Sequence, residues 1–221
     1  MRIIYLESCE STQILVENAL KSGELAPPFC LWTLNQTDGI GSRENKWRSA
    51  SGNLAFSFAL SRESLPADLP PQSASIYFGT LFKMTLADFG SQAWLKWPND
   101  LYINKKKCGG IITKAIAKPD SQALICGIGL NIASPDPKIY GAIDIKIVDF
   151  ESLLAGYLGK ISRKTAYSLV FSEFGLEFAR SLSQGLELNA HINGVKTSLK
   201  DAILNDDGSL TIGAERVYSQ R

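Results

Sequence analysis

The chain has 221 residues and a mass of 24.1 kDa, the size of one ordinary domain with a small appendage. Its composition, 45% hydrophobic and 20% charged residues, is typical of globular proteins and excludes the disordered and fibrous classes. Lysine and arginine number 23 against 22 acidic residues, whereas a protein that binds nucleic acid through its phosphates usually has a basic excess. We therefore expect no nucleic-acid partner.

No targeting or membrane signal is found. Glu7 comes before a signal-peptide apolar core can form, and the nearly uncharged run 123–133 is far shorter than the roughly 20 residues that span a bilayer. The cysteines, at positions 9, 30, 108 and 126, lack the paired spacing of a zinc knuckle or a redox dithiol. We expect a cytoplasmic protein with free thiols, no membrane partner and no bound structural metal.

The first half of the sequence mixes helical and extended patterns. Ser11 and Thr12 cap a helix that ends at Gly23. Residues 29–34 predict a strand, which leads into a glycine-containing and charged loop at 36–47. Alternation over residues 53–60 predicts a half-buried strand, and apolar residues at helical spacing over 78–89 predict a core helix.

The second half begins with short extended runs, at 94–97, 101–103, 111–112 and 123–132. The polar run 104–107 predicts a hairpin with a solvated turn. Two helices follow, at 150–160 and 164–182, and the pairs Asn193-Gly194 and Asp207-Gly208 predict hairpin turns near the end.

This order predicts an α/β (α+β) fold in two parts. A mixed β-sheet flanked by helices occupies residues 1–186, and a small barrel-like β domain occupies residues 187–221. His191 lies in the second part. It is the only histidine, so a Ser-His-Asp triad would have to use it, and we expect it to have no catalytic role.

The loop at 36–47 is a candidate anion site. Gly39 and Gly41 allow backbone N–H groups to turn toward an anion, and Arg43 and Lys46 add positive charge. Glu44 stands where a P-loop requires glycine, so the loop is not a P-loop. An ordinary flexible surface loop is the alternative.

The run Lys96-Trp97-Pro98-Asn99-Asp100 is a second candidate. A lysine at the end of an apolar strand, followed by a proline-stiffened turn with an amide and an acid, can hold an ammonium beside a reacting phosphate. A solvated strand end with an Asx turn explains the same residues equally well.

Two glycine motifs lie where strands are predicted. Gly109-Gly110 and Gly127-x-Gly129-x-Asn131 place glycine where it is unfavourable, which indicates close approach of a ligand or another backbone. A plain bulge is the alternative at the first motif. At the second, the Asn131 amide could bond the edge of a heterocycle.

Together these motifs occur in an order that resembles the biotin protein ligases. The resemblance covers residues 8–132, continues more weakly into the C-terminal tail, and has its most specific motif in the Lys96-to-Asp100 run. It implies a short member of the family without a DNA-binding domain. The implied fold is a class II synthetase-like catalytic domain with an SH3-like C-terminal barrel.

The resemblance also implies site residues. The implied biotin-binding residues are Ser11, Thr12, Gln13, Gln36, Gly39, Ile40, Gly41, Ser42, Lys96 and Gly110. The implied ATP-binding residues are Arg43, Trp47, Lys96, Asn99 and Asn131. Trp47 would stack near the adenine, and Asn131 would bond its edge.

The implied catalytic residues are Lys96, Arg43 and Asp100. Lys96 would reach the carboxylate and the α-phosphate, and Asp100 would orient Lys96 or help to deprotonate the acceptor amine. Two features depart from the family. Gln13 replaces the usual asparagine, and Arg43 is the only arginine in a loop where several members have more.

The implied reaction uses ATP with Mg²⁺ to convert biotin to biotinyl-5′-AMP, then transfers biotin to a lysine of a biotin carboxyl carrier protein domain, that of acetyl-CoA carboxylase. It needs charge neutralisation and no enzyme nucleophile, because two anions must come within bonding distance. The lack of a predicted triad agrees with this chemistry.

Three alternatives stay open. A lipoate or octanoate ligase or transferase of the same superfamily binds a linear aliphatic acid, which has little use for Ser11, Thr12 and Gln36. A biotin-sensing repressor that also ligates would need a DNA-binding domain ahead of residue 8. A non-enzymatic biotin-sensing regulator has no use for Lys96. The oligomeric state also stays open, a homodimer included, because an edge strand could pair either way.

Overall fold

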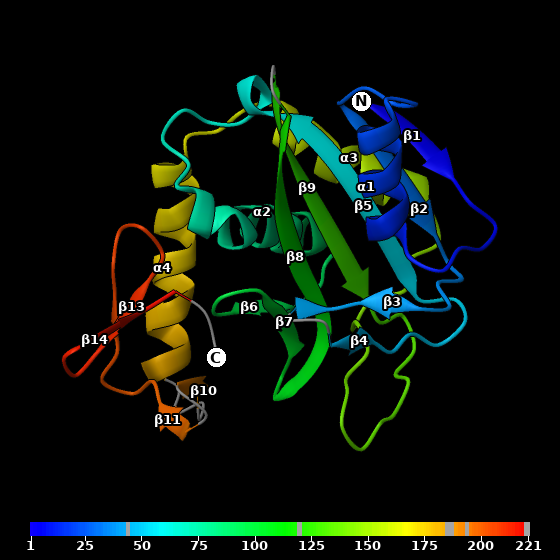
Figure 1. Cartoon of the computed structure of the whole chain (residues 1–221). Helices are drawn as coiled ribbons and strands as arrows, with labels where there is room; N and C mark the ends of the chain where they lie inside the picture. The colour runs from blue at the N-terminus through cyan, green and yellow to red at the C-terminus, as the bar shows by residue number, and fades with distance from the viewer. Residues whose placement is uncertain (43–44, 119–120, 184–187, 193–194, 219–221) are drawn as a thin grey trace.

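A seven-stranded sheet forms the centre of this computed structural model, which describes residues 1–42, 45–118, 121–183, 188–192 and 195–218 (Figure 1). Its strands are β1 (Arg2–Tyr5), β2 (Phe29–Thr33), β5 (Leu54–Ser61), β6 (Trp94–Lys96), β7 (Asp100–Ile103), β8 (Lys106–Lys118) and β9 (Ser121–Leu130). Their order across the sheet is β1-β2-β5-β9-β8-β7-β6. Only β1 and β2 run parallel to each other; the other neighbours in this sheet are antiparallel. The sheet is therefore mixed, as predicted.

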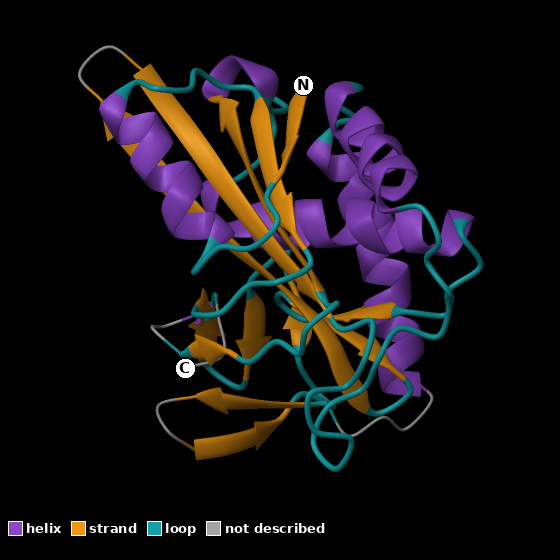
Figure 2. Ribbon diagram, turned by 90° about the vertical axis from the view of Figure 1, so that its right-hand side faces the viewer, coloured by secondary structure: helices purple, strands orange, loops and turns teal. Residues whose placement is uncertain are grey.

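Helices cover both faces of the sheet (Figure 2). On one face, α1 (Thr12–Ser22) packs Val16 against Leu31 of β2 and Ile125 of β9. On the other face, α2 (Ala74–Asp88) and α3 (Phe150–Ser162) pack against the larger side chains of the sheet, and α4 (Tyr167–Ser183) packs on α2. The two faces thus have separate hydrophobic clusters, the larger one beneath α2 and α3.

The prediction that β5 is half-buried is wrong. Every residue from Leu54 to Leu60 is buried, because β5 lies inside the sheet and both faces are covered. Phe56 and Phe58 face α2 and α3, where they make edge-on contacts with Tyr157. The opposite face carries small residues, Ala55, Ser57 and Ala59 among them, and space is left there.

The helix predicted after Ser11 is confirmed as α1, with Gly23 in the left-handed conformation (φ 78°) at its C-terminal end. The core helix predicted over 78–89 is α2, which begins at Ala74. The predicted solvated turn at 104–107 is shorter than expected. Strand β8 already begins at Lys106, so only Asn104 and Lys105 form the turn.

The C-terminal tail contains two small antiparallel sheets. One pairs β10 (Asn189–Ile192), which contains His191, with β11 (Val195–Ser198). The other joins β12 (Ile203–Leu204), β13 (Leu210–Ile212) and β14 (Glu215–Val217). No pairing among the described residues closes these sheets into the predicted barrel.

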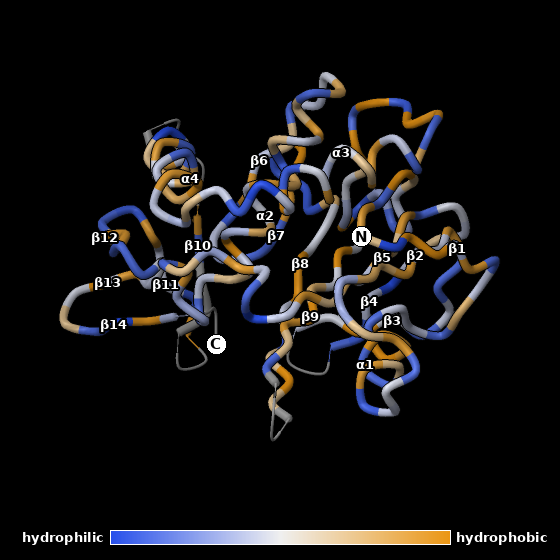
Figure 3. Tube along the Cα trace, turned by 90° about the horizontal axis from the view of Figure 1, so that it is seen from above, coloured by the Kyte–Doolittle hydropathy of each residue, from blue (hydrophilic) through white to orange (hydrophobic). Residues whose placement is uncertain are grey.

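The tail lies beside α4, on the side of the molecule away from β1 (Figure 1, Figure 3). Leu188, Leu199 and Leu210 are buried in the same cluster as the sheet and α2, so the tail shares the main core. The predicted boundary at 186 and 187 and the turn at Asn193-Gly194 lie outside the described residues. The division into two domains therefore stays a prediction.

The two edges of the sheet differ. At β6, the backbone N–H of Leu95 donates to the Glu177 carboxylate of α4 (2.6 Å), which occupies part of that edge. At β1, the side chains of Ile3 and Tyr5 are exposed. Among the helices in the described ranges, none has the length and apolar composition needed to cross a bilayer.

The aromatic cluster beneath β5 makes a stability prediction. Phe56→Ala removes a buried ring that contacts Phe82 (centroids 5.4 Å apart) and Tyr157 (5.8 Å), so we expect the free energy of unfolding to fall by about 3–5 kcal/mol. Urea denaturation measures it. Ile139→Ala, at an exposed position, is the control and should change it by less than about 0.5 kcal/mol. A loss below about 1 kcal/mol for Phe56→Ala would contradict this view of the core.

Candidate functional site

A cavity of about 440 Å³, including its open mouth, lies on the face of the sheet that carries α1. Its floor follows from the register, which aligns Ala55 of β5, Gly129 of β9 and Gly110 of β8 across three neighbouring strands. The lining residues are Ser11, Thr12, Gln13, Gln36, Ile40, Gly41, Ser42, Trp47, Ala55, Ser57, Asn99, Asp100, Lys107, Gly110, Ile111, Ile112, Gly127, Ile128 and Gly129.

One end of the cavity is polar and buried. The Gln36 side-chain carbonyl accepts hydrogen bonds from the backbone N–H (2.9 Å) and the hydroxyl (3.2 Å) of Thr12. The same hydroxyl lies 2.9 Å from the Ser57 hydroxyl. These contacts fix the start of α1 against the loop that precedes β3 (Gly39–Ile40).

Two polar atoms at this end have no partner among the described residues. They are Ser11 Oγ and Gln13 Oε1, and both side chains are at least 95% buried. Ser11 occupies the N-cap of α1, yet its hydroxyl makes no capping bond. A buried polar atom without a partner costs about 1–3 kcal/mol, so a ligand that bonds to both would recover free energy.

Glycines make room for these side chains. The Gln13 amide oxygen occupies the space that a side chain at Gly127 would need, and the Gln36 amide does the same at Gly39. The glycine pattern at 127–129 therefore reflects close approach, as predicted, but the approaching groups in this structure are side chains of the protein itself.

The loop at 36–47 forms a short hairpin instead of an open loop. Strand β3 pairs with β4 (Lys46–Trp47), and Lys46 forms an ion pair with Asp38 (2.9 Å). The hairpin places Trp47 against the sheet, where a Cβ at Gly129 would lie 2.5 Å from its ring. Arg43 lies outside the described residues.

The opposite end of the cavity is charged. Lys107 Nζ lies 2.6 Å from Asp100 Oδ1 and 5.6 Å from the centre of the Trp47 ring. The Lys107 side chain is 29% exposed and the Asp100 side chain 16% exposed, so the ammonium is partly withdrawn from water. Sequence reasoning missed this residue and treated it as part of a solvated turn.

A β-bulge explains the position of Lys107. The register pairs Leu101 with Gly109 but Tyr102 with Lys107, so that Cys108 is the extra residue of β8. Without the bulge, Lys107 and Gly110 would point to opposite faces. The bulge brings the ammonium to the face of the cavity.

Lys96 lies on the same face but outside the lining of the cavity. It pairs with Asp100 in the sheet, and its ammonium lies 5.2 Å from the centre of the Tyr102 ring. Burial lowers the pKa of Lys96, and the neighbouring Asp100 carboxylate partly opposes that shift. The structure therefore brings Lys107, not Lys96, to the charged end of the cavity at Asp100, which we call the mouth.

The two asparagines implied for ATP differ in position. Asn99 lines the cavity, and its amide donates to the Ile111 carbonyl (2.7 Å). Asn131 is 1% exposed, with its amide bonded to Asn53 (3.3 Å) and to the Gly141 carbonyl (3.2 Å). In this arrangement Asn131 fixes the loop after β9 and presents no open edge to a nucleotide.

Most of the predicted site residues therefore meet around one cavity. The polar start of α1, the hairpin, Asn99, Asp100 and Gly110 all contribute to the lining; Gly39 supports the hairpin behind it. Sequence reasoning missed Ser57, Ala55 and Lys107. No local pattern marks Ser57, because it reads as one small residue of an alternating strand.

Comparisons with known proteins support a ligase. The sequence profile of the Biotin/lipoate A/B protein ligase family matches residues 5–131. A bifunctional ligase/repressor, BirA of Bacillus spizizenii, is 32% identical over 132 residues, which are 59% of this chain and 40% of the relative. This chain thus spans about 40% of the length of the first curated relatives that it matches.

Solved structures match nearly the whole chain. A biotin acetyl coenzyme A carboxylase synthetase from Helicobacter pylori, with bound biotinylated ATP, has a TM-score of 0.88 and 37% identity over 98% of this chain and 99% of that chain. A biotin protein ligase from Aquifex aeolicus, in complex with biotin and ATP, has a TM-score of 0.68 and 23% identity, covering 99% and 96%. The second comparison shows a shared fold.

The contact between Gly129 and Trp47 makes a prediction. Gly129→Ala places a methyl group 2.5 Å from the ring, so Trp47 must move away from the sheet. We expect the free energy of unfolding to fall by about 1–3 kcal/mol and acrylamide quenching of tryptophan fluorescence to increase. Gly156→Ala in α3, where the nearest atom lies 3.9 Å away, should leave quenching unchanged and raise the free energy of unfolding by about 0.5–1 kcal/mol, because alanine is favoured over glycine inside a helix. Unchanged quenching in Gly129→Ala would contradict the contact.

Proposed function

Because the chain belongs to the Biotin/lipoate A/B protein ligase family, we propose that it adenylates biotin with ATP and transfers biotin to a lysine of a biotin carboxyl carrier protein domain, that of acetyl-CoA carboxylase. One observation carries the proposal. The cavity has unsatisfied buried polar atoms, on Ser11 and Gln13, at one end and the Lys107 ammonium at the other. Biotin has the complementary ends, a ureido group and a carboxylate.

The polar end supports a ureido ligand over an aliphatic acid. Gln13 Oε1 can only accept a hydrogen bond, and the Ser11 hydroxyl can donate one. A ureido group has both N–H donors and a carbonyl acceptor. The dithiolane of lipoate and the chain of octanoate would leave both buried atoms unsatisfied, at a cost of about 1–3 kcal/mol each.

The charged end supports adenylation. In this step a carboxylate oxygen of biotin attacks the α-phosphorus of ATP, the bond to pyrophosphate breaks, and biotinyl-5′-AMP forms. Both reactants are anions, so the step needs fixed positive charge where negative charge gathers. We assign this role to Lys107, held by Asp100, because Lys107 lines the cavity and Lys96 does not.

The second step transfers the acyl group. The neutral amine of the acceptor lysine attacks the acyl carbon, the bond to the phosphate oxygen breaks, AMP leaves, and the amine loses a proton. Asp100 lies at the mouth and lines the cavity, so its carboxylate can orient the incoming amine or accept that proton.

The hairpin covers the ligand in this proposal. Trp47 lies over the glycine floor, beside Lys107, and would cover the apolar part of biotin and keep water from the mixed anhydride. Its predicted stacking on the adenine would require Trp47 to leave Gly129. Gly41, Ser42 and Arg43 are proposed to close over the phosphate.

The nucleotide would lie beyond the mouth, near Asn99 and Asp100. An adenine contact by Asn131 would have to replace its bond to the Gly141 carbonyl. No group of three or more candidate metal ligands is found in the described part of the chain. Magnesium is therefore proposed to bind together with ATP, coordinated by the phosphates, with Asp100 as the nearby carboxylate.

The setting of the reaction is also proposed. All four cysteines are free, and three are buried, which fits a reducing compartment such as the cytoplasm. Homodimerisation and the absence of a nucleic-acid partner stay predictions.

A direct assay tests the proposal. The chain is incubated with biotin, ATP, Mg²⁺ and a biotin carrier domain, and the domain is blotted for biotin. We expect labelling of one lysine that requires ATP. Lipoate in place of biotin should give no modified carrier; a lipoylated carrier without biotinylation would overturn the assignment in favour of the aliphatic acid.

The two candidate lysines make a prediction. Lys107→Met removes the ammonium at the mouth, so biotinyl-5′-AMP formation should slow about 100- to 1000-fold, a size typical of losing one electrostatic group. Lys96→Met should cost less, because its ammonium lies on Tyr102. Lys105→Met, in the exposed turn, is the control and should match the wild type. Pyrophosphate release measures all three; a larger loss for Lys96→Met would return the role to Lys96.

Replacing Ser11 should affect stability and biotin affinity in different directions. Ser11→Ala removes an unsatisfied buried hydroxyl that makes no capping bond, so the free energy of unfolding should stay the same or rise by about 1 kcal/mol. Biotin affinity should fall about tenfold, the value of one hydrogen bond in a buried site. Urea denaturation and calorimetric titration measure the two. Ser172→Ala, on the exposed face of α4, should leave affinity unchanged. Equal affinity in Ser11→Ala would show that its hydroxyl does not touch biotin.

A further inference from the structure

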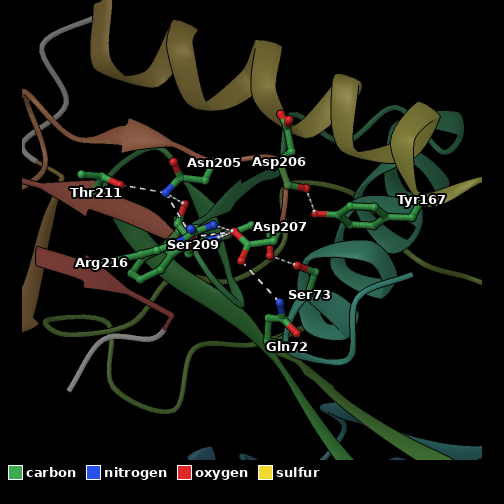
Figure 4. A network of polar contacts seen from close by, with 11 residues as sticks. Gln72, Ser73, Tyr167, Asn205, Asp206, Asp207, Ser209, Thr211 and Arg216 are labelled. Atoms are coloured by element: carbon green, nitrogen blue, oxygen red, sulfur yellow. Dashed lines mark hydrogen bonds and ion pairs between the residues drawn. The ribbon is translucent and has the colours of Figure 1, made fainter. Parts of the chain in front are cut away.

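The turn between β12 and β13, residues 205–209, is bonded to three separate parts of the protein (Figure 4). Three consecutive carbonyl oxygens of the turn accept side-chain hydrogen bonds. The pairs are Tyr167 with Asp206 (3.0 Å), Ser73 with Asp207, and Trp97 with Gly208 (2.8 Å). These donors come from α4, from the residue before α2, and from the segment between β6 and β7. The turn therefore joins elements that are far apart in the sequence.

The turn is itself fixed. The Asp207 carboxylate accepts bonds from the backbone N–H (3.1 Å) and hydroxyl (2.6 Å) of Ser209 and forms an ion pair with Arg216 (2.9 Å). Burial disfavours the charged carboxylate, but these bonds outweigh it and lower the pKa of Asp207 to about 2. Gly208 has φ 77°, and a Cβ there would lie 2.5 Å from Ser73 Oγ. Glycine is required at this position for both reasons.

Trp97 leads directly to the charged mouth. Its side chain is fully buried, and two residues later Asn99 is bonded twice to Ile111 of β8, through its carbonyl (2.8 Å) and its amide (2.7 Å). The next residue, Asp100, holds Lys107 (2.6 Å). Trp97, which donates to the Gly208 carbonyl, is thus only three residues before Asp100, the acidic member of the ion pair at the mouth of the cavity.

We propose that the Asp206–Gly208 turn is a positioning element for the adenylation site, acting through the hydrogen bond from the Trp97 indole N–H to the Gly208 carbonyl. Trp97 and Gly208 are positioning residues, because neither lines the cavity. The bond holds residues 97–100 so that Asp100 keeps Lys107 at the mouth. This inference rests on the proposed function, and it gives the C-terminal tail a part in catalysis besides its part in the core.

The test compares two substitutions that each remove one buried donor and keep an aromatic ring. Trp97→Phe removes the bond to Gly208. Tyr77→Phe removes the bond from the Tyr77 hydroxyl to the Thr165 carbonyl (2.9 Å), which touches neither the turn nor the mouth. Both should lower the melting temperature, since each leaves a carbonyl without its donor, and Trp97→Phe should lower it further because the smaller ring leaves a cavity in the core.

The kinetic readout separates positioning from stability. Below both melting temperatures, Trp97→Phe should lower kcat for biotinyl-5′-AMP formation about two- to tenfold, the range expected for one hydrogen bond. The Kd for biotin alone should rise by a smaller factor than kcat falls, because the substitution leaves the Ser11 and Gln13 contacts in place and affects only the Lys107 end of the ligand. Tyr77→Phe should keep the wild-type kcat. Equal kcat in all three proteins, or an equal fall in both variants, would overturn the proposal.

A second readout does not depend on activity. The Ile111 N–H donates to the Asn99 carbonyl, so its amide hydrogen exchange reports how firmly the 97–100 segment is held. It should exchange faster in Trp97→Phe than in Tyr77→Phe. Should the wild type form no adenylate, the proposed function fails while this comparison still decides the positioning. Where Trp97→Phe does not fold, Ser73→Ala loosens the same turn and should raise exchange at Ile111; unchanged exchange there would refute the link.

Discussion

The cavity exists because three small residues lie side by side on β5, β9 and β8. Larger side chains at these positions would fill the space beneath the hairpin. Ala55, Gly129 and Gly110 form one row of the sheet, and Ser57 with Gly127 form the next. Small residues on one face are tolerated because the other face of the same strands carries Phe56, Phe58 and Ile128, which build the main core. The sheet therefore separates two tasks by side-chain alternation: one face stabilises the fold, and the other holds the cavity.

The bulge at Cys108 completes this arrangement. Regular alternation along β8 would give the face of the cavity to Gly110 and Cys108 and would turn Lys107 away. With one extra residue in β8, Cys108 is buried in the main core and Lys107 reaches Asp100 on the adjacent strand. The ion pair depends on the cross-strand position of Asp100, opposite Gly110, and so on the segment that begins at Trp97. A charged group of the cavity is here positioned by an irregularity of the backbone, a common use of bulges.

The main helices and strands could be predicted from the sequence because they rest on local signals, whereas most of the lining residues were implied only by the resemblance to the biotin protein ligases. Gly23 ends α1, the alternation at 53–60 marks β5, and Lys96-Trp97-Pro98-Asn99-Asp100 marks the mouth. The position of Lys107 in the cavity could not be predicted, because a bulge changes which face of the sheet a residue occupies and no local sequence pattern marks it. Lys107 sits in a run of three lysines beside a polar turn, a pattern that ordinarily indicates solvent exposure. The burial of Ser57 also could not be predicted from the sequence, since it depends on neighbouring strands that are adjacent only in the folded sheet.

The unsatisfied atoms of Ser11 and Gln13 connect stability with selectivity. Without a ligand, each costs the folded protein free energy, about 1–3 kcal/mol for a fully buried group. A ligand that bonds to both recovers that cost, whereas a ligand of similar size without donors and acceptors leaves it in place. Discrimination against apolar analogues then needs no steric barrier, because the empty hydrogen-bonding positions already disfavour them. The room for Gln13 comes from the absent side chain of Gly127, so under the proposed function the small residues that open the cavity also contribute to its ligand selectivity.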